Sequence, residues 1–358
     1  MKKGFIIIFT FLTIISCKQH KNVTVMVRQM ADTVGFANKA FKADSVIARI
    51  QRLQADSLNA KPLNESFRMA ICPHDDYTYV GWQYPAVLRN IQAKTVIIFG
   101  VAHKAKKFNL ENKLIFDGFD YWHGPYSNIK ISDLRDKIIR LMPTGMAEVH
   151  DSMHIVEHSI ESMLPILQHF NPDVEIVPIV VPYMSLARID EISKELARAI
   201  DSVAKENKLT WGKDFALLIT TDAVHYGDED WGGKNYAPFG ADPAGYQKAV
   251  AREHEIISSC LTGNLTPQRI QKFFAYTVNP NDYREYQWTW CGRYSVPMGL
   301  SAGNYLNNLR TGEPLIGGFI GYSTSIDHSP LPVDDIGMGR TAIANIHHWV
   351  GYASVGYR

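Results

Sequence analysis

The sequence predicts a single α/β domain in which helices flank a central, largely parallel or mixed sheet. Apolar runs rich in β-branched residues recur at residues 69–72, 94–100, 174–181 and 214–221. Such runs are typical of strands that a parallel sheet buries on both faces. Segments with helical spacing alternate with them, and neither a repeat nor a linker divides the chain, which favours one α/β unit.

The helices expected between these strands follow from apolar residues three and four positions apart. In residues 43–58, Val46, Ile50 and Leu53 have this spacing, and Asp44 is a suitable N-cap. Further helices are expected at residues 84–92, 132–141, 188–204, 244–260, 267–274 and 295–310, and closing strands at 317–322 and 348–357.

Composition bounds the class of protein. The chain has 358 residues, of which 46% are hydrophobic and 20% charged, as is ordinary for globular proteins. Its formal net charge is +1, from 37 basic and 36 acidic residues. Because phosphate binding relies on an excess of Lys and Arg, we expect no nucleic-acid partner.

The N-terminus has the pattern of a processing signal. Lys2 and Lys3 precede an apolar stretch at residues 4–15, which is too short to span a bilayer. The stretch ends in Ser16-Cys17 and is followed by polar residues, which resembles a bacterial lipobox. A plain secretory signal or an uncleaved N-terminal anchor is the alternative interpretation.

This pattern predicts a lipoprotein signal peptide at residues 1–16, a lipid-anchored tether at 17–42 and the α/β domain at 43–358. Lipidated Cys17 would hold the protein on a membrane surface without embedding its fold. We therefore expect an exported bacterial lipoprotein, anchored on the periplasmic side or at the cell surface.

The mature body would retain Cys72, Cys260 and Cys291, an odd number that suggests a free thiol in an exported protein. Their spacings are too wide for CxxC metal knuckles. A disulfide between Cys72 and Cys260 stays open at this stage.

Several of the predicted strands end on residues of the kinds that bind metals. His74, His103 and His225 each follow such a strand, with Asp222 shortly before His225. Strand ends converge on one crevice in open α/β sheets. With Cys291 as a thiolate, two imidazoles would form a ligand set for Fe(II), Cu or Zn that leaves coordination positions open.

These histidines and Cys291 also have simpler, structural interpretations. A single His is more often a satisfied surface or core side chain than a ligand, and the chain has 13 of them. On spacing alone, Cys291 fits a small buried hydrophobic residue better than a ligand.

A dense polar cluster occupies residues 150–161, with His158 between Glu157 and Glu161. On a helix the two glutamates would share one face, since they are four positions apart. An apolar helix is expected to follow, through Leu164 and Leu167.

Six motifs in the chain resemble, in order, those of the Memo family, also called AmmeMemoRadiSam system protein B. They are PHDDYTYVG at 73–81, GVAH at 100–103, EHSIE at 157–161, TTDAVHYG at 220–227, CG at 291–292 and VGYAS at 350–354. Asp75-Asp76 stands where the family has a small Ala-Gly pair.

The resemblance implies a fold similar to class III extradiol dioxygenases. It implies that His74, His103 and Cys291 are the metal ligands, with cysteine in place of the glutamate of the dioxygenases. Asp222 and His225 would line the same pocket, and His225 would be the acid–base group.

The remaining motif residues are expected around this centre. Asp75, Tyr77, His158 and Glu161 would form the pocket wall or support the ligands.

The leading functional hypothesis is a metal-dependent oxidoreductase with a divalent metal, Fe(II) before Cu or Zn, acting on a small-molecule or peptide ligand in the metal crevice. One alternative is a non-catalytic ligand- or peptide-binding module, and another is a zinc hydrolase that activates a water molecule.

Overall fold

The computed structural model describes residues 25–358. The expected signal peptide and the lipidation site Cys17 lie outside this range. Within the described residues, no helix combines the length and the apolar character that a membrane crossing requires.

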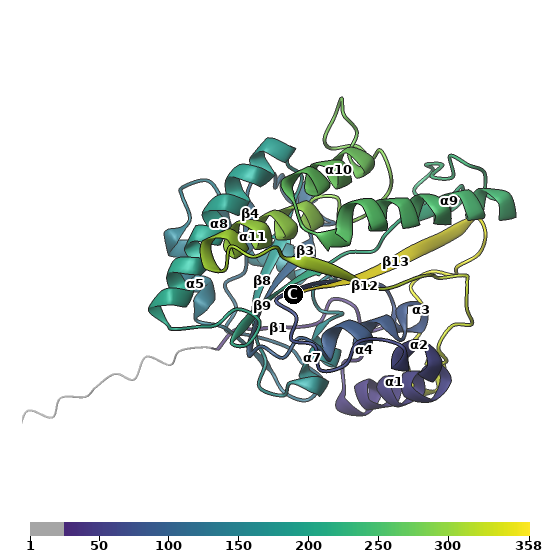
Figure 1. The fold of residues 1–358 in the computed structure, drawn as a ribbon. Helices are drawn as coiled ribbons and strands as arrows, with labels where there is room; N and C mark the ends of the chain where they lie inside the picture. Colours follow the sequence, from purple (N-terminus) through teal and green to yellow (C-terminus); the bar gives the residue numbers. More distant parts are fainter. Residues whose placement is uncertain (1–24) are drawn as a thin grey trace, which may run out of the picture.

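A large mixed sheet forms the middle of the molecule (Figure 1). Its strands run in the order β1-β5-β6-β8-β3-β9-β2-β13-β12-β11, while β10 pairs with β13, and β4 pairs with β7 and β8. The strands are β1 (Val27–Arg28), β2 (Met69–Cys72), β3 (Thr95–Val101), β4 (Leu114–Phe116), β5 (Tyr121–Trp122), β6 (Ile129–Ile131), β7 (Ala147–Val149), β8 (Glu175–Val181), β9 (Phe215–Thr220), β10 (His225–Gly227), β11 (Gly263–Asn264), β12 (Ile316–Thr324) and β13 (His348–Tyr357).

Helices cover both faces of this sheet (Figure 1). One layer packs around α8 and α11, and the other around α1, α4 and α7. The helices are α1 (Ala40–Leu53), α2 (Ala55–Asn59), α3 (Tyr77–Val80), α4 (Gln83–Leu88), α5 (Leu134–Leu141), α6 (Asp151–Ile155), α7 (Leu164–Phe170), α8 (Leu186–Glu206), α9 (Pro243–Ile256), α10 (Pro267–Thr277) and α11 (Ser295–Arg310).

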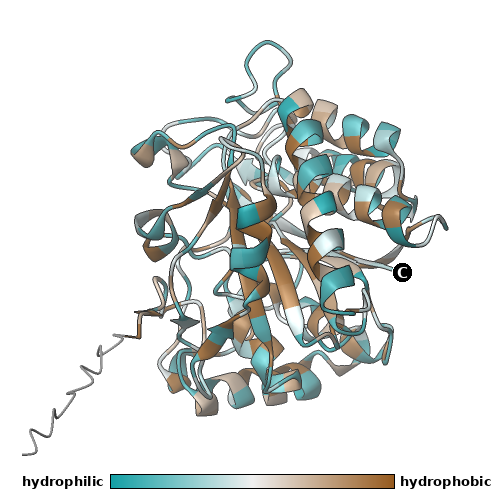
Figure 2. Ribbon diagram, turned by 90° about the vertical axis from the view of Figure 1, so that its left-hand side faces the viewer, coloured by the Kyte–Doolittle hydropathy of each residue, from teal (hydrophilic) through white to brown (hydrophobic). Residues whose placement is uncertain are grey.

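The central strands contribute to both cores because successive side chains point to opposite faces. On β3, Ile97 and Phe99 pack into the α8/α11 core, whereas Val96 and Ile98 pack into the core on the other face. Figure 2 shows these strands as apolar ribbons between helices that alternate apolar and polar residues. The prediction of buried strands in a mixed sheet with flanking helices is therefore confirmed.

One local expectation was wrong, and one question that the sequence leaves open is answered. Residues 157–163 form turns rather than a helix, and the helix begins only at Leu164. Cys72 and Cys260 are free thiols in the cores on opposite faces of the sheet, so no disulfide joins them.

The segment before residue 43 takes part in the fold. β1 pairs in parallel with β5, and Arg28 is buried. Helix α1 begins at Ala40 and ends at Leu53, because the chain turns at Gln54, whose side-chain oxygen accepts a hydrogen bond from the backbone N–H of Trp82. The domain thus includes residues that the sequence assigns to a tether.

Candidate metal centre

The candidate site lies at the carboxyl edge of three neighbouring parallel strands. β2, β9 and β3 are adjacent and in register, with Cys72 opposite Thr220, and Ile219 opposite both Ile71 and Phe99. The three strands therefore end at the same edge of the sheet. His74 follows β2 there, His103 follows β3, and Asp222 follows β9.

Three of these side chains form a compact donor set. Donor atoms of His74, His103 and Cys291 all lie within 4.8 Å of one another. His74 is 1% exposed and Cys291 is 6% exposed. The structure thus brings together the three residues that the sequence singles out as ligands.

The geometry of this set fits a metal ion. Cys291 Sγ lies 3.5 Å from His74 Nε2. Bond lengths of about 2.3 Å to sulfur and 2.0 Å to nitrogen at a tetrahedral angle require roughly this separation. Burial, reinforced by the neighbouring His103, holds the pKa of His74 well below its usual range. The imidazole is consequently neutral and able to act as a ligand.

A glutamate fixes the second histidine. Glu157 accepts a hydrogen bond from His103 Nδ1 at 2.8 Å and another from the His103 backbone N–H at 2.8 Å. Because Nδ1 is occupied, Nε2 is left for a metal. Burial opposes the charge of Glu157, but His103 and the backbone N–H of Ser159 outweigh it, so the pKa of Glu157 falls below its usual range.

Asp222 connects the first histidine to the cysteine. Its Oδ1 accepts a hydrogen bond from the backbone N–H of His74 at 2.9 Å, and its own backbone N–H donates to Cys291 Sγ at 3.1 Å. Oδ2 lies 3.5 Å from His74 Nε2. Burial and the charge of Asp222 raise the pKa of the Cys291 thiol, and the N–H donated to sulfur offsets this only in part, so the thiolate would depend on a bound metal.

Cys291 reaches the site through a tight turn before α11. Gly292 follows it, and a Cβ at this position would lie 2.2 Å from Thr221 Oγ1. Thr221 Oγ1 instead accepts a hydrogen bond from the Gly292 N–H at 3.0 Å. Only glycine therefore allows the turn to approach β9 this closely.

Two further histidines border the donor set. The ring of His158 stacks on that of His103, with centroids 4.7 Å apart, and meets His74 edge-on at 5.8 Å. His225 shares a second donor group with Asp222 and Cys291. Its Nε2 is buried and has no hydrogen-bond partner among residues 25–358.

Glu161 does not lie beside Glu157 on a common face. It pairs with buried Arg28 and accepts hydrogen bonds from the backbone N–H groups of Ala31 and Asp32. Arg28 also donates to the carbonyls of His154 and Glu157. Glu161 thus secures the turn that carries Glu157, rather than facing the donor set.

The two carboxylates that follow His74 accept hydrogen bonds from other parts of the chain. Asp75 accepts a hydrogen bond from the Tyr352 hydroxyl at 2.7 Å, and Asp76 accepts one from the Thr341 backbone at 2.6 Å. Burial raises the pKa of both carboxyls to about 7. Tyr77 donates to the carbonyl of Ser162 at 2.7 Å and so braces the same turn as Glu161.

Two cavities lie next to the donor set. An inner cavity of about 80 Å³ is bordered by His103 and Cys291, and by Arg293. An outer cavity of about 590 Å³ shares Tyr183, Tyr286 and Arg293 with it. The sequence reasoning missed these three residues and Glu157. The sequence does indicate two of these residues by their place in a motif. Arg293 follows the Cys-Gly pair, and Glu157 is the first residue of the EHSIE motif.

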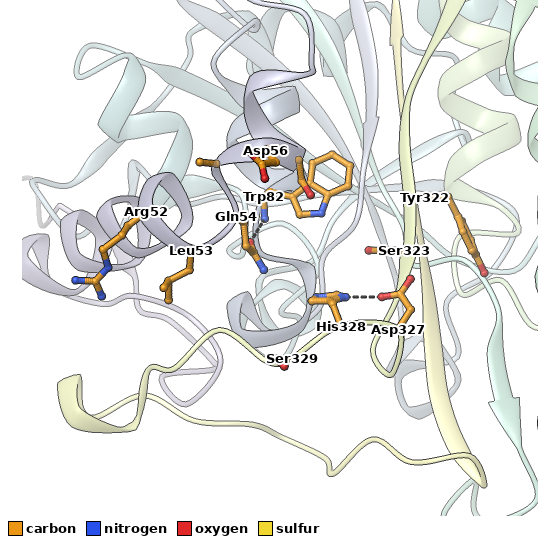
Figure 3. Close-up of a pocket in the computed structure, with 12 residues that line it drawn as sticks. Arg52, Leu53, Gln54, Asp56, Trp82, Tyr322, Ser323, Asp327, His328 and Ser329 are labelled. Atoms are coloured by element: carbon orange, nitrogen blue, oxygen red, sulfur yellow. Dashed lines mark hydrogen bonds and ion pairs between the residues drawn. The ribbon is translucent and has the colours of Figure 1, made fainter.

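A separate cavity of about 620 Å³ lies between α1, α2 and β12 (Figure 3). Figure 3 shows His328 directed at Asp327, with Trp82 and Gln54 opposite. Both ring nitrogens of His328 are engaged, one by Asp327 and one by the carbonyl of Tyr79 at 2.9 Å. This histidine therefore has no free nitrogen for a ligand.

The comparisons with known proteins agree with the motifs. A family profile described as Memo-like protein matches residues 40–335. A MEMO1 family protein of Pyrococcus horikoshii is 25% identical over 206 residues, or 56% of this chain and 66% of that protein. Those of Aquifex aeolicus and Saccharolobus islandicus are 29% and 30% identical over 159 and 162 residues.

Each of the last two alignments covers 44% of this chain, and they cover 53% and 52% of the relatives. The chain therefore spans about half to two thirds of the length of the curated relatives that it matches. The profile, in contrast, extends from α1 to the segment before β13 and includes all residues of the donor set. The chain belongs to the Memo-like family.

Proposed function

We propose that this protein is a metal-dependent oxidoreductase with a non-heme metal, Fe(II) in first place and copper in second, held by His74, His103 and Cys291. One observation carries the proposal: two imidazoles and a thiol converge within 4.8 Å at a buried strand edge, beside a cavity. Three protein ligands and an adjacent cavity are the arrangement of a metal site that keeps positions open for chemistry.

When bound there, the metal would supply redox chemistry with O₂ and a substrate oxygen. The protein's own residues would hold the ligands and move protons. Burial lowers the pKa of His225 to about 3, so its ring is neutral at neutral pH. With Nε2 unpaired among the described residues, neutral His225 would accept a hydrogen bond from a substrate hydroxyl, and it would take the proton only when a negative charge that develops on the substrate raises its pKa.

The neighbouring residues would keep the ligands in place. Asp222 orients His74 through its backbone N–H, and Glu157 fixes the tautomer of His103. His158, stacked on the His103 ring, would limit its rotation and narrow the space beside it. None of these roles requires a change of fold between the free and loaded protein.

Zinc-dependent hydrolysis is the second candidate. It is favoured by the second donor group, Asp222, His225 and Cys291, which overlaps the first at the cysteine. A nitrogen, oxygen and sulfur donor set suits zinc, and hydrolysis would also need a base that takes a proton from water, for which His225 and Glu161 are the candidates. Glu161 is engaged by Arg28, so His225 would be the base, but only for zinc held by His74, His103 and Cys291, because a zinc ligand of the second group cannot also take a proton.

The first experiment is elemental analysis with spectroscopy on anaerobically purified wild type, His74→Ala and Cys291→Ala. The proposal expects stoichiometric Fe or Cu in the wild type and its loss in both variants. Wild type without Fe or Cu, together with unchanged metal content in Cys291→Ala, would refute it. Zinc without Fe or Cu would favour the hydrolase.

The second experiment measures oxygen consumption with a panel of phenolic and ring substrates. Turnover by the wild type that His225→Asn abolishes, with metal content retained, is the expected result. No turnover across the panel, combined with saturable ligand binding, would instead favour a non-catalytic ligand- or peptide-binding module.

We also propose that the protein is an exported lipoprotein, anchored to a membrane through Cys17. The support is the order of charged, apolar and small residues before that cysteine. Expression in a bacterium with labelled fatty acid should give a labelled membrane-fraction protein. Equal labelling of Cys17→Ser would contradict this proposal.

A further inference from the structure

Arg293 is a buried cation beside the candidate metal centre, where it lines a cavity together with His103 and Cys291. It is 4% exposed and lies among three tyrosine rings. Its guanidinium carbon lies 3.5 Å from the ring centroid of Tyr286, 4.8 Å from that of Tyr294 and 5.8 Å from that of Tyr183. Stacking of this kind orients the planar group and partly offsets its loss of water.

The hydrogen bonds of Arg293 go to neutral acceptors. Nε donates to the Tyr294 hydroxyl at 2.9 Å, and Nη2 donates to the carbonyl of Arg284 at 2.9 Å. Burial raises the pKa of Tyr286 and Tyr294 to about 12, so neither phenol is an anion at neutral pH. Within residues 25–358, Arg293 forms no ion pair with a carboxylate.

A buried guanidinium without a counter-ion is costly, because arginine stays protonated and its desolvation is not repaid by Coulomb attraction. Nη1 of Arg293 makes no hydrogen bond to the described part of the chain. The guanidinium of Arg293 therefore lacks an anionic partner within the fold that the structure describes, and it offers one half of a binding site for an anion.

Arg293 also lies close to the proposed metal ligands. It borders the inner cavity together with His103 and Cys291, and it borders the outer cavity as well. Arg293 is thus one of the three residues that line both cavities, and it is the charged one. The inner cavity, about 80 Å³, holds only a compact group.

The other charges of the outer cavity are largely balanced. Arg284 pairs with Glu111 at 2.8 Å, and Lys234 pairs with Glu285 at 3.3 Å. Lys106 and Asp282 also border this cavity, with opposite charges. Among the described residues that line these two cavities, Arg293 is therefore a buried positive charge without a carboxylate partner.

We propose that Arg293 binds an oxyanion, a carboxylate or a phosphate, of the small molecule that this site accepts, and so positions the rest of that molecule at His103 and Cys291. The fork of a guanidinium matches both oxyanions in a bidentate manner. The inference rests on the proposed function for its location, but binding of the anion requires neither turnover nor a particular metal.

The test is calorimetric titration of the purified protein with benzoate and phenyl phosphate, each compared with neutral benzamide. The wild type should bind at least one anion about tenfold more tightly than benzamide, as a charge-assisted hydrogen bond would give. Arg293→Gln should abolish this preference, and Arg293→Lys should retain only part of it. The preferred anion identifies the oxyanion as carboxylate or phosphate.

Arg284→Gln is the matched control, because Arg284 borders the same outer cavity but already has a carboxylate partner. It should leave the anion preference within about twofold. Equal affinity of the wild type for anions and benzamide, no binding at millimolar concentration, or equal losses in Arg284→Gln and Arg293→Gln would overturn the proposal. The wild-type comparison decides even if Arg293→Gln does not fold.

The two proposals fail in different ways. Titrations before and after removal of metal by a chelator separate anion binding from metal content. An anion preference in protein that contains neither Fe nor Cu as purified would support the role of Arg293 and refute the oxidoreductase proposal. Stoichiometric Fe or Cu with no anion preference would support the oxidoreductase proposal and refute the role of Arg293.

Discussion

Glu157 and His103 are joined twice, since one carboxylate accepts hydrogen bonds from both the ring Nδ1 and the backbone N–H of the same histidine. The pair connects the turn at residues 157–163 to the end of β3. Gly100 makes the approach of these segments possible, because a Cβ there would lie 2.6 Å from the side chain of Ile160. The charged carboxylate therefore fixes the His103 ring through Nδ1, and Nε2 is left for a metal.

Glu157→Gln should weaken metal binding without removing a ligand. The glutamine keeps one oxygen acceptor but loses the charge that orients His103 and increases its basicity. A loss of metal affinity of about 10- to 100-fold is expected, as for other carboxylates that support a metal-binding histidine. Competition with a chromophoric chelator measures the affinity.

Glu148→Gln is the control for this variant, because Glu148 forms a part-buried pair with Lys113 and has no hydrogen bond to the EHSIE motif. It should leave the affinity unchanged. Wild-type affinity in Glu157→Gln would show that His103 does not depend on this carboxylate, and the assignment of its tautomer would then be abandoned.

Cys291→Ala should reduce the stoichiometry of bound metal, because the thiol is the soft ligand of the set. Substitution of Co(II) provides a second readout, since a thiolate–cobalt charge-transfer band should be present in the wild type and absent in the variant. Cys260→Ala removes another buried thiol, on the face of α8 and α11, and should retain both metal and band. A band that persists in Cys291→Ala would exclude this residue as a ligand.

Glu253 should make stability depend on pH. Its carboxylate accepts hydrogen bonds from the indole N–H groups of Trp288 and Trp290 and from the backbone N–H of Val224. Burial nevertheless raises its pKa from 4.5 to about 7. The folded protein thus binds this proton more tightly than the unfolded chain does, so stability falls as pH rises through this window and is constant above it.

The shift corresponds to about 3 kcal/mol of unfolding free energy. Chemical denaturation of wild type and Glu253→Gln at several pH values isolates this contribution as the change in their difference. The difference should favour Glu253→Gln increasingly between roughly pH 4.5 and pH 7. A difference that stays constant over this range would contradict the prediction, and carboxyl NMR of the wild type gives the pKa independently.

The sequence predicts the strand-end residues because parallel strands in register end at a common edge. His74, His103 and Asp222 follow β2, β3 and β9 directly, so identifying three buried runs suffices to bring them together. The position of Cys291 is less predictable, since it depends on the turn before α11 and its contact with Thr221. Here the ordered motifs, rather than periodicity, supplied the prediction.

The supporting residues are harder to predict. Helical spacing suggested that Glu157 and Glu161 share a face, but the segment forms turns, and the two carboxylates have separate partners in His103 and Arg28. Arg28 comes from a strand of two residues, too short to give any pattern. Arg293 acquires its role from three tyrosines, of which only Tyr294 is its neighbour in sequence, so the folded chain is needed to bring all three around the guanidinium.

Arg28 is expected to stabilise the fold and to position Glu157. Arg28→Met leaves the buried carboxylate of Glu161 without its cation and the carbonyls of His154 and Glu157 without a donor. Breaking a buried pair on one side costs about 3–5 kcal/mol. Denaturant unfolding should show this loss, and chelator competition should show weaker metal binding in the variant that remains folded.

Two further variants separate the ion pair from the general effect of losing an arginine. In the double variant Arg28→Met with Glu161→Leu, no charge is left unpaired, so part of the lost stability should return. Arg49→Met removes an exposed pair with Asp335 and should change stability little. If the double variant were no more stable than Arg28→Met, the cost would lie in the lost carbonyl contacts, and Arg28 would act on the turn at 157–163 directly rather than through Glu161.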